Sequence, residues 1–319
     1  MSSLANNERP ELVGRFAPSP SGRFHVGNIF SSMIAALVAD KMILRIEDLD
    51  PDRSKQQFID AVMHDLDWFG FEWVGEVLYQ SAAERQRAYA EALASLEERG
   101  LVYPCFCSRA DLHSARAPHV GEEFVYQNTC KHLSPSERAE RTLMRDPALR
   151  LDVEGAGIIS FDDLFQGNQE YDLVRCAGDF IVRRSDGVFA YQLAVVVDDA
   201  ASGITSVVRG VDLLSSTPKQ IYLQQLLDHE TPSYGHVPIF VDESGRKLSK
   251  RNNDASLDYL IEGLGMGPQD ILGYLAFLAG IIPDARPMSL DQLKRCANLD
   301  ALCNKRTIVW RSPRRSFIL

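Results

Sequence analysis

The sequence has no long hydrophobic run: none of its apolar stretches approaches the roughly 18 residues that a membrane-spanning helix needs. The segment MSSLANNERPELVG has no basic stretch followed by an apolar core, so it does not read as a secretory signal. Cysteine is scarce, with six in 319 residues, which is too few for a disulfide scaffold. Internal repeats and low-complexity segments are also missing. We therefore expect a cytoplasmic protein with reduced thiols and no membrane partner.

Positive charge is in short supply as well. The chain has 34 Lys and Arg against 44 Asp and Glu, a formal net charge of −10. This balance disfavours non-specific binding to nucleic acid, although a local basic face stays possible. The densest basic segment is NKRTIVWRSPRRSFIL (304–319), which we interpret as a solvated tail in preference to an RNA contact. The 45% of hydrophobic residues is ordinary for a globular protein of one large or two to three modest domains.

Strand and helix patterns alternate over the first hundred residues. The segments 12–18 and 41–48 predict strands, whereas 28–40, 54–70 (opened by Ser54 and closed by Gly70) and 82–100 predict helices. This alternation predicts an α/β fold with a parallel sheet and crossover helices. The first helix meets the second strand at Asp40–Lys41 almost without a connection, although such loops usually have about 2–6 residues. Either the helix is short, or a loop is absent from this chain.

The pattern changes between Leu101 and Glu170, where cysteine, histidine, proline and charged residues predict an inserted subdomain. The segment 180–200 then predicts a hairpin that turns at Asp186–Gly187. Further along, 204–210 predicts a strand, 217–228 a helix, and 236–254 a strand with a polar loop. From Ala255 onward the pattern is mainly helical.

The stretch GRFAPSPSGRFHVGN (14–28) ends in His-x-Gly-Asn just where the first helix should begin. Free backbone N–H groups at a helix start can meet an anion. His25 can donate to phosphate oxygens, and Gly27 leaves room for a flat ring near the backbone. The stretch predicts a nucleotide with its phosphates over the helix start, but a plain strand-to-helix turn fits it equally well.

A second stretch, GRKLSKR (245–251), places Lys247 and Lys250 around Ser249 on a polar loop. Lysines on such a loop can close over a triphosphate and stabilise the charge that develops on leaving pyrophosphate. An isolated lysine pair is more often an exposed basic turn. Its combination with His-x-Gly-Asn far upstream favours nucleotide chemistry.

Three of the cysteines are close in sequence, in the pattern Cys105-x-Cys107 and, further on, Tyr126-x3-Cys130. Three thiolates and a fourth ligand can form a closed structural zinc site. By residue type alone a histidine is the favoured fourth ligand, and reduced free cysteines are the alternative. The nearby histidines are His113, His119 and His132, and the remaining cysteines are scattered at Cys176, Cys296 and Cys303.

These motifs together resemble a known family. HVGN (25–28) is similar to the HIGH signature of class I aminoacyl-tRNA synthetases, and KLSKR (247–251) to their KMSKS loop. The longer strings GRFAPSPSGRFHVGN, RIEDLDPDR and YQLAVVVDD…VVRGVDLL resemble glutamyl-tRNA synthetases, over about Gly14 to Lys250. Asn28 stands for the final His of HIGH, which the family accepts. Leu248 and Arg251 stand for Met and Ser of KMSKS, and the effect of Arg251 is open.

The resemblance implies a Rossmann-like catalytic domain in two halves, at 1–100 and 171–253. It implies that an acceptor-end-binding subdomain with a zinc site is inserted at 101–170, and that a short helical region follows at 254–319. The implied activity is ATP-dependent formation of glutamyl-adenylate, with Mg²⁺ accompanying the ATP.

The resemblance also assigns site residues. It implies that glutamate is bound by Arg15, Phe16, Ala17, Pro18, Ser19, Glu47, Tyr191 and Arg209. It implies that ATP is bound by Pro18, His25, Gly27, Asn28 and Lys250, and that His25, Gly27, Asn28, Lys247 and Lys250 serve catalysis. Arginine suits a carboxylate and Glu47 an α-ammonium; by pattern alone, Glu47 could pair with Arg45 and Tyr191 could be a core aromatic. The implied zinc ligands, one ion per chain, are Cys105, Cys107, Tyr126 and Cys130.

Only residues 252–319 follow the second motif, which is too little for the anticodon-reading region of a full glutamyl-tRNA synthetase. The chain therefore resembles most the shortened subfamily that attaches glutamate to queuosine in the anticodon of tRNA-Asp. The alternatives are a truncated synthetase that charges tRNA 3′ ends, a non-catalytic paralogue that binds tRNA or nucleotide, and an unrelated nucleotidyltransferase of the same superfold. No heptad or large apolar stripe is evident, so we expect a monomer.

Overall fold

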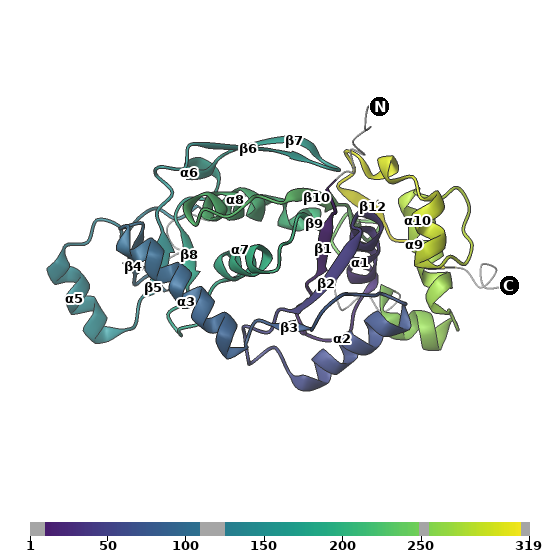
Figure 1. Ribbon diagram of the computed structural model, residues 1–319, viewed down its shortest axis with the longest axis horizontal. Helices are drawn as coiled ribbons and strands as arrows, with labels where there is room; N and C mark the ends of the chain where they lie inside the picture. Colours follow the sequence, from purple (N-terminus) through teal and green to yellow (C-terminus); the bar gives the residue numbers. More distant parts are fainter. Residues whose placement is uncertain (1–9, 109–124, 249–254, 314–319) are drawn as a thin grey trace, which may run out of the picture.

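A parallel sheet runs through the middle of the computed structural model, which describes residues 10–108, 125–248 and 255–313 (Figure 1). One half pairs β1 (Val13–Phe16), β2 (Lys41–Ile46) and β3 (Leu78–Tyr79) in parallel. The other half pairs β9 (Ser206–Gly210), β10 (Ser233–Val237) and β6 (Ile158–Asp163) in parallel, with β7 (Gly167–Asp172) antiparallel at the edge. The N–H of Thr205 donates to the carbonyl of Val13 at 2.9 Å. This bond brings β9 alongside β1 and joins the two halves, so the α/β class is as predicted.

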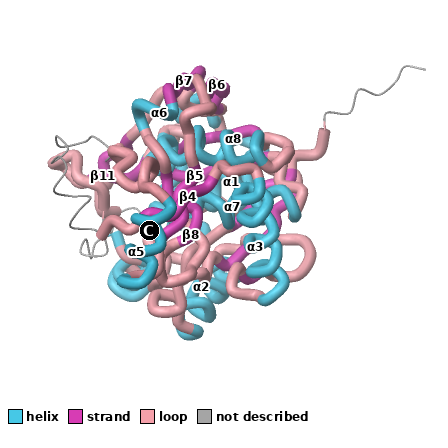
Figure 2. Tube along the Cα trace, turned by 90° about the vertical axis from the view of Figure 1, so that its left-hand side faces the viewer, coloured by secondary structure: helices cyan, strands magenta, loops and turns pink. Residues whose placement is uncertain are grey.

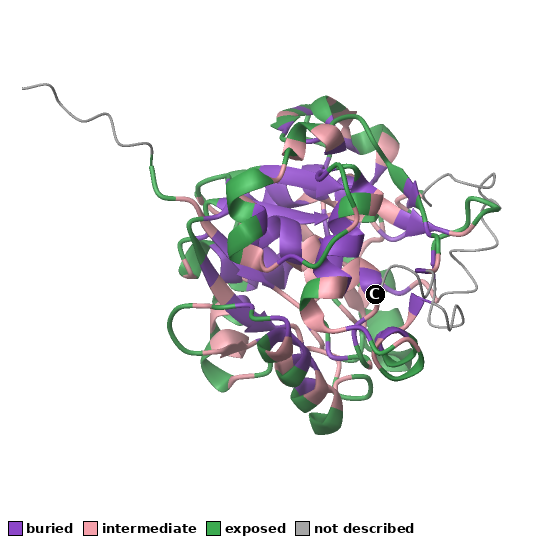
Figure 3. Ribbon diagram, turned by 90° about the vertical axis from the view of Figure 1, so that its right-hand side faces the viewer, coloured by how far each residue is buried: buried purple, intermediate pink, exposed green. Residues whose placement is uncertain are grey.

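Two groups of helices cover this sheet. The helix α1 (Val26–Val38) buries Ile29, Phe30 and Met33 against β1 and β9 on one side and against helices near the C-terminus on the other. The second group consists of α3 (Ala83–Glu98), α7 (Tyr191–Ala201) and α8 (Thr217–Leu226), in which α7 packs against both α3 and α8. The remaining long helix of the N-terminal part is α2 (Gln56–Trp68). Figure 3 shows buried strands and helix faces enclosed by exposed outer turns.

The tight connection at Asp40 exists because α1 ends early. The helix stops at Val38, two residues before the predicted end, and Asp40 then bonds to Leu12 through both its backbone and its side chain. The short-helix alternative is therefore confirmed. One detail of the next helix is wrong: α2 starts at Gln56 with Lys55 at its N-cap, so Ser54 does not cap it.

The predicted hairpin at 180–200 is wrong in its second half. The strand β8 (Phe180–Arg183) and the turn at Asp186–Gly187 are present, and the N–H of Arg184 donates to the carbonyl of Val188 at 2.8 Å. Pairing then stops after a single bridge, and the chain enters α7 instead of a strand. The apolar run in α7 is buried on all sides, and periodicity alone cannot distinguish a buried helix from a buried strand.

A smaller antiparallel sheet is made of β4 (Val102–Cys105), β5 (Ala148–Leu151) and β8. Figure 2 views the molecule from this end, with α5 (Pro135–Met144) close to these strands. Two pairings cross the predicted boundary at residue 170. The strand β8, which follows residue 170, joins β4 and β5 in the small sheet, whereas β6, which precedes it, joins β10 in the large sheet. The division of the chain at residues 100, 170 and 253 stays a prediction.

The C-terminal part lies at the opposite end of the long axis (Figure 1). It contains the helices α9 (Pro268–Ala279) and α10 (Leu290–Cys296), and a short strand, β12 (Thr307–Val309), which pairs in parallel with β11 (Ile239–Val241). The short elements that remain are α6 (Leu173–Cys176), the 3₁₀ helices Val211–Ser216 and Leu299–Leu302, and the π-helical turn Tyr259–Gly263. Among the described residues, every helix is too short or too polar to span a bilayer.

Candidate functional site

A cavity of about 590 Å³ lies at the carboxyl ends of β1, β2, β9 and β10, where open α/β sheets place their ligands. It brings together every predicted glutamate or nucleotide residue that the structure describes. These are Arg15, Phe16, Ala17, Pro18, Ser19, His25, Gly27, Asn28, Glu47, Tyr191, Arg209 and Lys247. The predicted Lys250 lies outside the described residues, as do Ser249 and Arg251.

His25 caps the start of α1 at one wall of this cavity. The backbone N–H of Gly27 donates to His25 Nδ1 at 3.0 Å, and the N–H of His25 donates to Asn28 Oδ1 at 3.1 Å. Because Nδ1 accepts a hydrogen bond, a neutral His25 ring carries its proton on Nε2. Asn28 is therefore more than a tolerated replacement in the signature, since its amide oxygen completes a capping box. The arrangement offers an N–H donor beside the N-terminus of a helix, which suits a phosphate.

Lys247 reaches the same cavity from the polar loop after β11. Its Nζ lies 2.6 Å from Asp212 Oδ2, and its side chain is about half exposed. The neighbouring Leu248 is buried, and its N–H donates to the carbonyl of Phe240 at 3.0 Å. The apolar residue thus fixes the loop to β11 while the lysine remains at the cavity. Any phosphate that binds Lys247 competes with Asp212 for its ammonium.

Arg209 lies at the end of β9 and is 5% exposed. Its Nη1 donates to the hydroxyl of Tyr191 at 3.2 Å, and its Nη2 donates to Thr217 Oγ1 at 2.8 Å. Tyr191 is half-buried at the first position of α7 and lines the cavity, so it is not a core aromatic. The guanidinium is held from several sides while it still contributes to the cavity wall.

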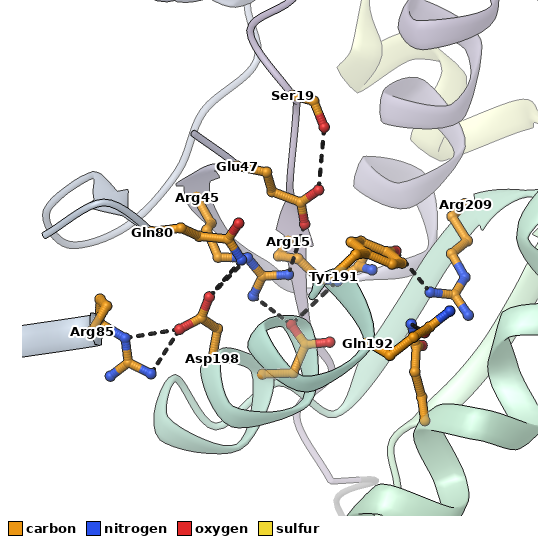
Figure 4. Close-up of polar contacts among 12 residues, drawn as sticks. Arg15, Ser19, Arg45, Glu47, Gln80, Arg85, Tyr191, Gln192, Asp198 and Arg209 are labelled. Atoms are coloured by element: carbon orange, nitrogen blue, oxygen red, sulfur yellow. Dashed lines mark hydrogen bonds and ion pairs between the residues drawn. The ribbon is translucent and has the colours of Figure 1, made fainter. Parts of the chain in front are cut away.

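Glu47 follows β2 and faces two weak partners (Figure 4). Its Oε2 lies 3.4 Å from Ser19 Oγ, and its Oε1 lies 3.4 Å from Arg45 Nη2. Arg45 has a closer partner in Asp199, whose Oδ1 lies 2.5 Å from Arg45 Nη1. Burial raises the pKa of Glu47 above its ordinary value, although Arg45 and Arg15 act in the opposite direction. A cationic group from a substrate would stabilise the ionised form of this carboxyl.

Arg15 adds a second guanidinium at the end of β1. It is 5% exposed, and its Nη1 donates to the carbonyl of Val208 at 3.3 Å. Its Nε lies 3.5 Å from Asp199 Oδ1 but makes no hydrogen bond to the described residues. The cavity therefore has two buried arginines and the largely buried carboxylate of Glu47 at one end, and a helix N-terminus with a lysine at the other.

A buried carboxylate behind the site was not predicted. Asp198 is fully buried in α7 and accepts hydrogen bonds from Gln80 at 2.8 Å, Arg85 at 2.8 Å and Tyr89 at 2.8 Å (Figure 4). Burial raises the pKa of the Tyr89 phenol, and the adjacent carboxylate adds to this shift, so the phenol stays a donor. The contacts tie α7, which presents Tyr191, to α3. The only signal in the sequence is an Asp-Asp pair that follows a wholly apolar run.

A separate cluster in the small sheet has the donor set of a metal site. The sulfur atoms of Cys105, Cys107 and Cys130 lie within 4.8 Å of one another. The hydroxyl of the buried Tyr126 lies 3.4 Å from Cys105 Sγ and 3.7 Å from Cys107 Sγ. Of the competing histidines, His132 is exposed and is not part of the cluster. The other two, His113 and His119, lie outside the described residues.

Arg150 stabilises negative charge in this cluster. Its Nε donates to Cys105 Sγ at 3.2 Å, and its guanidinium lies 3.7 Å from the centre of the Tyr126 ring. Burial raises the pKa of the Cys105 thiol, but its hydrogen bonds with Tyr126 and Arg150 outweigh this effect and bring the pKa below its ordinary value. Burial raises the pKa of Cys107 to about 12, and the neighbouring thiols add to this shift. A divalent cation would relieve the repulsion that opposes a second thiolate here.

Comparison with known proteins decides the family. Residues 11–303 match the family model "tRNA synthetases class I (E and Q), catalytic domain". A glutamyl-Q tRNA(Asp) synthetase of Nitratidesulfovibrio vulgaris is 44% identical, over 86% of this chain and 89% of its own. Namesakes from Symbiobacterium thermophilum and Neisseria meningitidis are 40% and 45% identical, over 88% and 77% of this chain and 91% and 82% of theirs. The chain belongs to the glutamyl-Q tRNA(Asp) synthetase family.

Membership of this family makes the chain a class I ligase, and solved structures agree on the fold. Glutamate-tRNA synthetase from Elizabethkingia anophelis superimposes with a TM-score of 0.79 at 22% identity, over 95% of this chain and 68% of that protein. The glutamate tRNA ligase of Elizabethkingia meningosepticum gives 0.77 at 22% identity, with the same coverage. The cavity at the strand ends therefore lies in a class I synthetase catalytic fold.

Proposed function

We propose that this chain activates L-glutamate with ATP and then transfers the glutamyl group to queuosine in the anticodon of tRNA-Asp. One observation carries the proposal: a single cavity joins an amino-acid end, with Arg15, Arg209 and Glu47, to a phosphate end, with His25 and Lys247. The name that the relatives bear, glutamyl-Q tRNA(Asp) synthetase, supports a queuosine-bearing tRNA-Asp as the acceptor. A tRNA substrate places the reaction in the cytoplasm, and we propose that the protein works there as a monomer.

Glutamate binds by charge complementarity. Arg209 and Arg15 are buried donors that suit its carboxylates, because guanidinium–carboxylate bonds are strong in a low-dielectric site. The α-ammonium binds Glu47, whose present contacts to Ser19 and Arg45 are both 3.4 Å and therefore weak. Two cations against one anion leave a net positive site for a substrate with a net negative charge.

ATP binds with its phosphates at the start of α1. His25 Nε2 donates toward the phosphates, the positive end of the helix dipole attracts them, and Lys247 leaves Asp212 to join them. Lys250, outside the described residues, would act beside Lys247. Mg²⁺ accompanies the triphosphate and neutralises part of its charge.

The chemistry is two substitutions without a protein nucleophile. A glutamate carboxylate oxygen bonds to the α-phosphorus while the bond to pyrophosphate breaks, and the leaving charge meets Lys247 and the helix N-terminus. A ring hydroxyl of queuosine then attacks the carbonyl of glutamyl-adenylate, loses its proton, and displaces AMP. The residues of the cavity act by positioning and by electrostatic stabilisation.

We also propose that Cys105, Cys107, Cys130 and Tyr126 hold one structural zinc ion. The geometry supports this donor set, since ligand sulfurs on a tetrahedral zinc ion lie about 3.8 Å apart when each Zn–S bond is about 2.3 Å. Cys107 Sγ and Cys130 Sγ are 3.6 Å apart, and Tyr126 supplies an oxygen at similar separations. The ion would stabilise a region whose own apolar cluster is small.

The proposal is tested with labelled glutamate, ATP and two preparations of tRNA-Asp, one with queuosine and one without. Both are used intact and with the 3′-terminal nucleotides removed. We expect label only on the queuosine-containing tRNA, and we expect it to survive removal of the 3′ end. Label that requires the 3′ end would instead support a truncated synthetase. No label and no glutamate-dependent exchange of pyrophosphate into ATP would support the non-catalytic paralogue.

A further inference from the structure

Behind Arg209 lies a buried Asp–His pair that the proposed chemistry does not use. Asp163 ends β6 and His236 lies in β10, and the sheet order β6–β10–β9 places them in line with Arg209. His236 and Arg209 are direct register partners on adjacent strands. Both side chains of the pair are 0% exposed, and Asp163 Oδ2 lies 2.5 Å from His236 Nδ1. His236 Nε2 lies 3.0 Å from Arg209 Nε, so the pair is bonded to a residue of the cavity.

The bonds of Asp163 determine which nitrogen of His236 carries the proton. Asp163 Oδ1 accepts three backbone N–H groups, from Phe165 at 3.0 Å, Gln166 at 2.9 Å and His236 at 3.0 Å. Only Oδ2 is left for the ring. Burial raises the pKa of Asp163, but the hydrogen bonds from His236 and the backbone outweigh it and keep the carboxyl ionised.

Burial also keeps the pKa of His236 below its ordinary value, and Arg209 acts in the same direction against Asp163. The ring is therefore neutral, with its proton on Nδ1 and a lone pair on Nε2. That lone pair accepts the Nε–H of Arg209, and the hydroxyl oxygen of Thr217 lies 3.1 Å from the same nitrogen.

Arg209 is consequently held at all three of its nitrogens. Nε donates to His236, Nη1 to Tyr191 and Nη2 to Thr217. The Tyr234 ring lies under the guanidinium, 5.5 Å from its carbon to the ring centre. Of the five donors of an arginine, the two that remain are both on Nη atoms, where a carboxylate can accept them in a bidentate way.

We propose that Asp163 and His236 are positioning residues that fix the guanidinium plane of Arg209 for a carboxylate of the amino-acid substrate. The inference rests on the proposed function, in which Arg209 binds glutamate. The pair acts only through Arg209, so it governs the affinity for the amino acid and leaves ATP binding unchanged.

The variant Asp163→Asn tests the inference because it reverses the proton on His236. The three backbone N–H groups retain the amide oxygen of the asparagine, so its NH₂ faces His236 Nδ1. The ring must then accept at Nδ1 and carry its proton on Nε2. That proton opposes the Nε–H of Arg209, and the acceptor beside it is Thr217 Oγ1, 3.1 Å from Nε2, which already accepts from Arg209 Nη2. We expect the KM for glutamate in ATP–pyrophosphate exchange to rise about tenfold or more, with the KM for ATP and kcat changed by less than about twofold. The matched control is Asp162→Asn, an exposed neighbour with the same change of charge.

A second variant provides a rescue that a merely structural role would not give. In Asp163→Asn/His236→Glu one carboxylate oxygen can accept from the asparagine NH₂ and the other from Arg209 Nε, so the donor conflict disappears. We expect the double variant to have a lower KM for glutamate than Asp163→Asn alone. In parallel, ¹⁵N NMR of labelled histidine should report the Nδ1–H tautomer of His236 in the unsubstituted protein and the Nε2–H tautomer in Asp163→Asn.

The outcomes distinguish failure of this inference from failure of the proposed function. Unchanged KM for glutamate in a folded Asp163→Asn protein with a reversed tautomer would overturn the inference alone. A double variant no better than Asp163→Asn would overturn it too, including where the single variant is poorly folded by circular dichroism. An unsubstituted protein that shows no glutamate-dependent exchange would overturn the proposed function itself.

Discussion

His25 Nδ1 lies 3.0 Å from the backbone nitrogen of Gly27, and this contact exists because residue 27 has no side chain. A Cβ atom at position 27 would lie 2.9 Å from His25 Cε1, closer than real Cβ atoms come to neighbouring atoms, and 3.0 Å from Nδ1, which is tighter than most real contacts. The glycine of the signature therefore makes room for the histidine ring. That reason differs from the one read from the sequence, which was room for a flat ligand. Both requirements act on the same position.

Gly27→Ala should therefore displace the His25 ring and weaken catalysis more than stability. We expect kcat for ATP–pyrophosphate exchange to fall about 10- to 100-fold, because a displaced donor no longer meets the developing phosphate charge. The free energy of unfolding in urea should change by less than about 1 kcal/mol, since alanine is a good helix residue. Gly155→Ala, where the nearest atom to the new Cβ is 3.7 Å away, is the control. Unaltered kcat in Gly27→Ala would argue against a role for His25 in the reaction.

Metal content should follow the thiol cluster and Tyr126. The purified protein is expected to hold about one zinc per chain. Cys107→Ser should lose most of it, and Tyr126→Phe should bind it more weakly because the oxygen ligand is gone. His132→Ala, an exposed neighbour outside the cluster, is expected to keep its zinc. Elemental analysis after dialysis against graded chelator measures all three, and zinc retention by Cys107→Ser would contradict the site.

The motifs of the site could be predicted from the sequence because the residues of each motif are adjacent in the chain. His25 to Asn28 and Lys247 to Leu248 each belong to a single turn, and the structure brings both to one cavity. Asp163 and His236 gave no such signal. They are 73 positions apart, and they become partners of Arg209 only through the strand order β6–β10–β9, which long-range pairing creates.

The segment after Gly187 shows a different limit. The run from Leu193 to Val197 has no polar face, since α7 is covered on all sides, and a strand was expected where a helix forms. The partners of the aspartates at the end of this run could not be predicted from the sequence either. Asp198 is stabilised by Gln80, Arg85 and Tyr89, which belong to a part of the sequence more than a hundred residues away.

Glutamate affinity should depend on pH through Glu47. Burial raises the pKa of this carboxyl above its ordinary value of 4.5, with Arg45 and Arg15 opposing the shift. Its ionised form holds the α-ammonium, so kcat/KM for glutamate should fall as the pH drops through the raised pKa. Glu47→Gln should have a lower kcat/KM at neutral pH and should lack this acidic limb. A limb that persists in Glu47→Gln would assign it to another group.

The stability of the fold should also depend on pH through Glu47, but in the opposite direction. A carboxyl whose pKa is higher in the folded state than in the unfolded state stabilises the fold at low pH, and this contribution is lost as the pH rises through the folded pKa. Relative to Glu47→Gln, the unsubstituted protein should therefore become less stable from pH 4.5 upward. Urea unfolding of both proteins across this range measures the difference.

Asp198 should be among the most sensitive positions of the fold. It is fully buried with Arg45 Nε at 3.8 Å and Arg85 Nη2 at 2.7 Å. Asp198→Ala leaves the guanidinium groups of Arg45 and Arg85 without this acidic partner. The loss of a buried ion-pair partner costs about 3–5 kcal/mol in the free energy of unfolding. Glu11→Ala, whose ion pair with Lys41 is about half exposed, should cost less than about 1 kcal/mol. Equal losses in the two variants would contradict the argument from burial.

The contact between Lys247 and Asp212 should oppose ATP binding. Lys247 Nζ lies 2.6 Å from Asp212 Oδ2, and both groups are partly exposed, so the pair is worth about 0.2–1 kcal/mol. Because Lys247 must leave Asp212 to meet a phosphate, Asp212→Asn should lower the KM for ATP by up to about fivefold. The same substitution in a Lys247→Ala background should have no such effect, which separates the ion pair from any other role of Asp212. An equal change in both backgrounds would mean that Asp212 acts on ATP without Lys247.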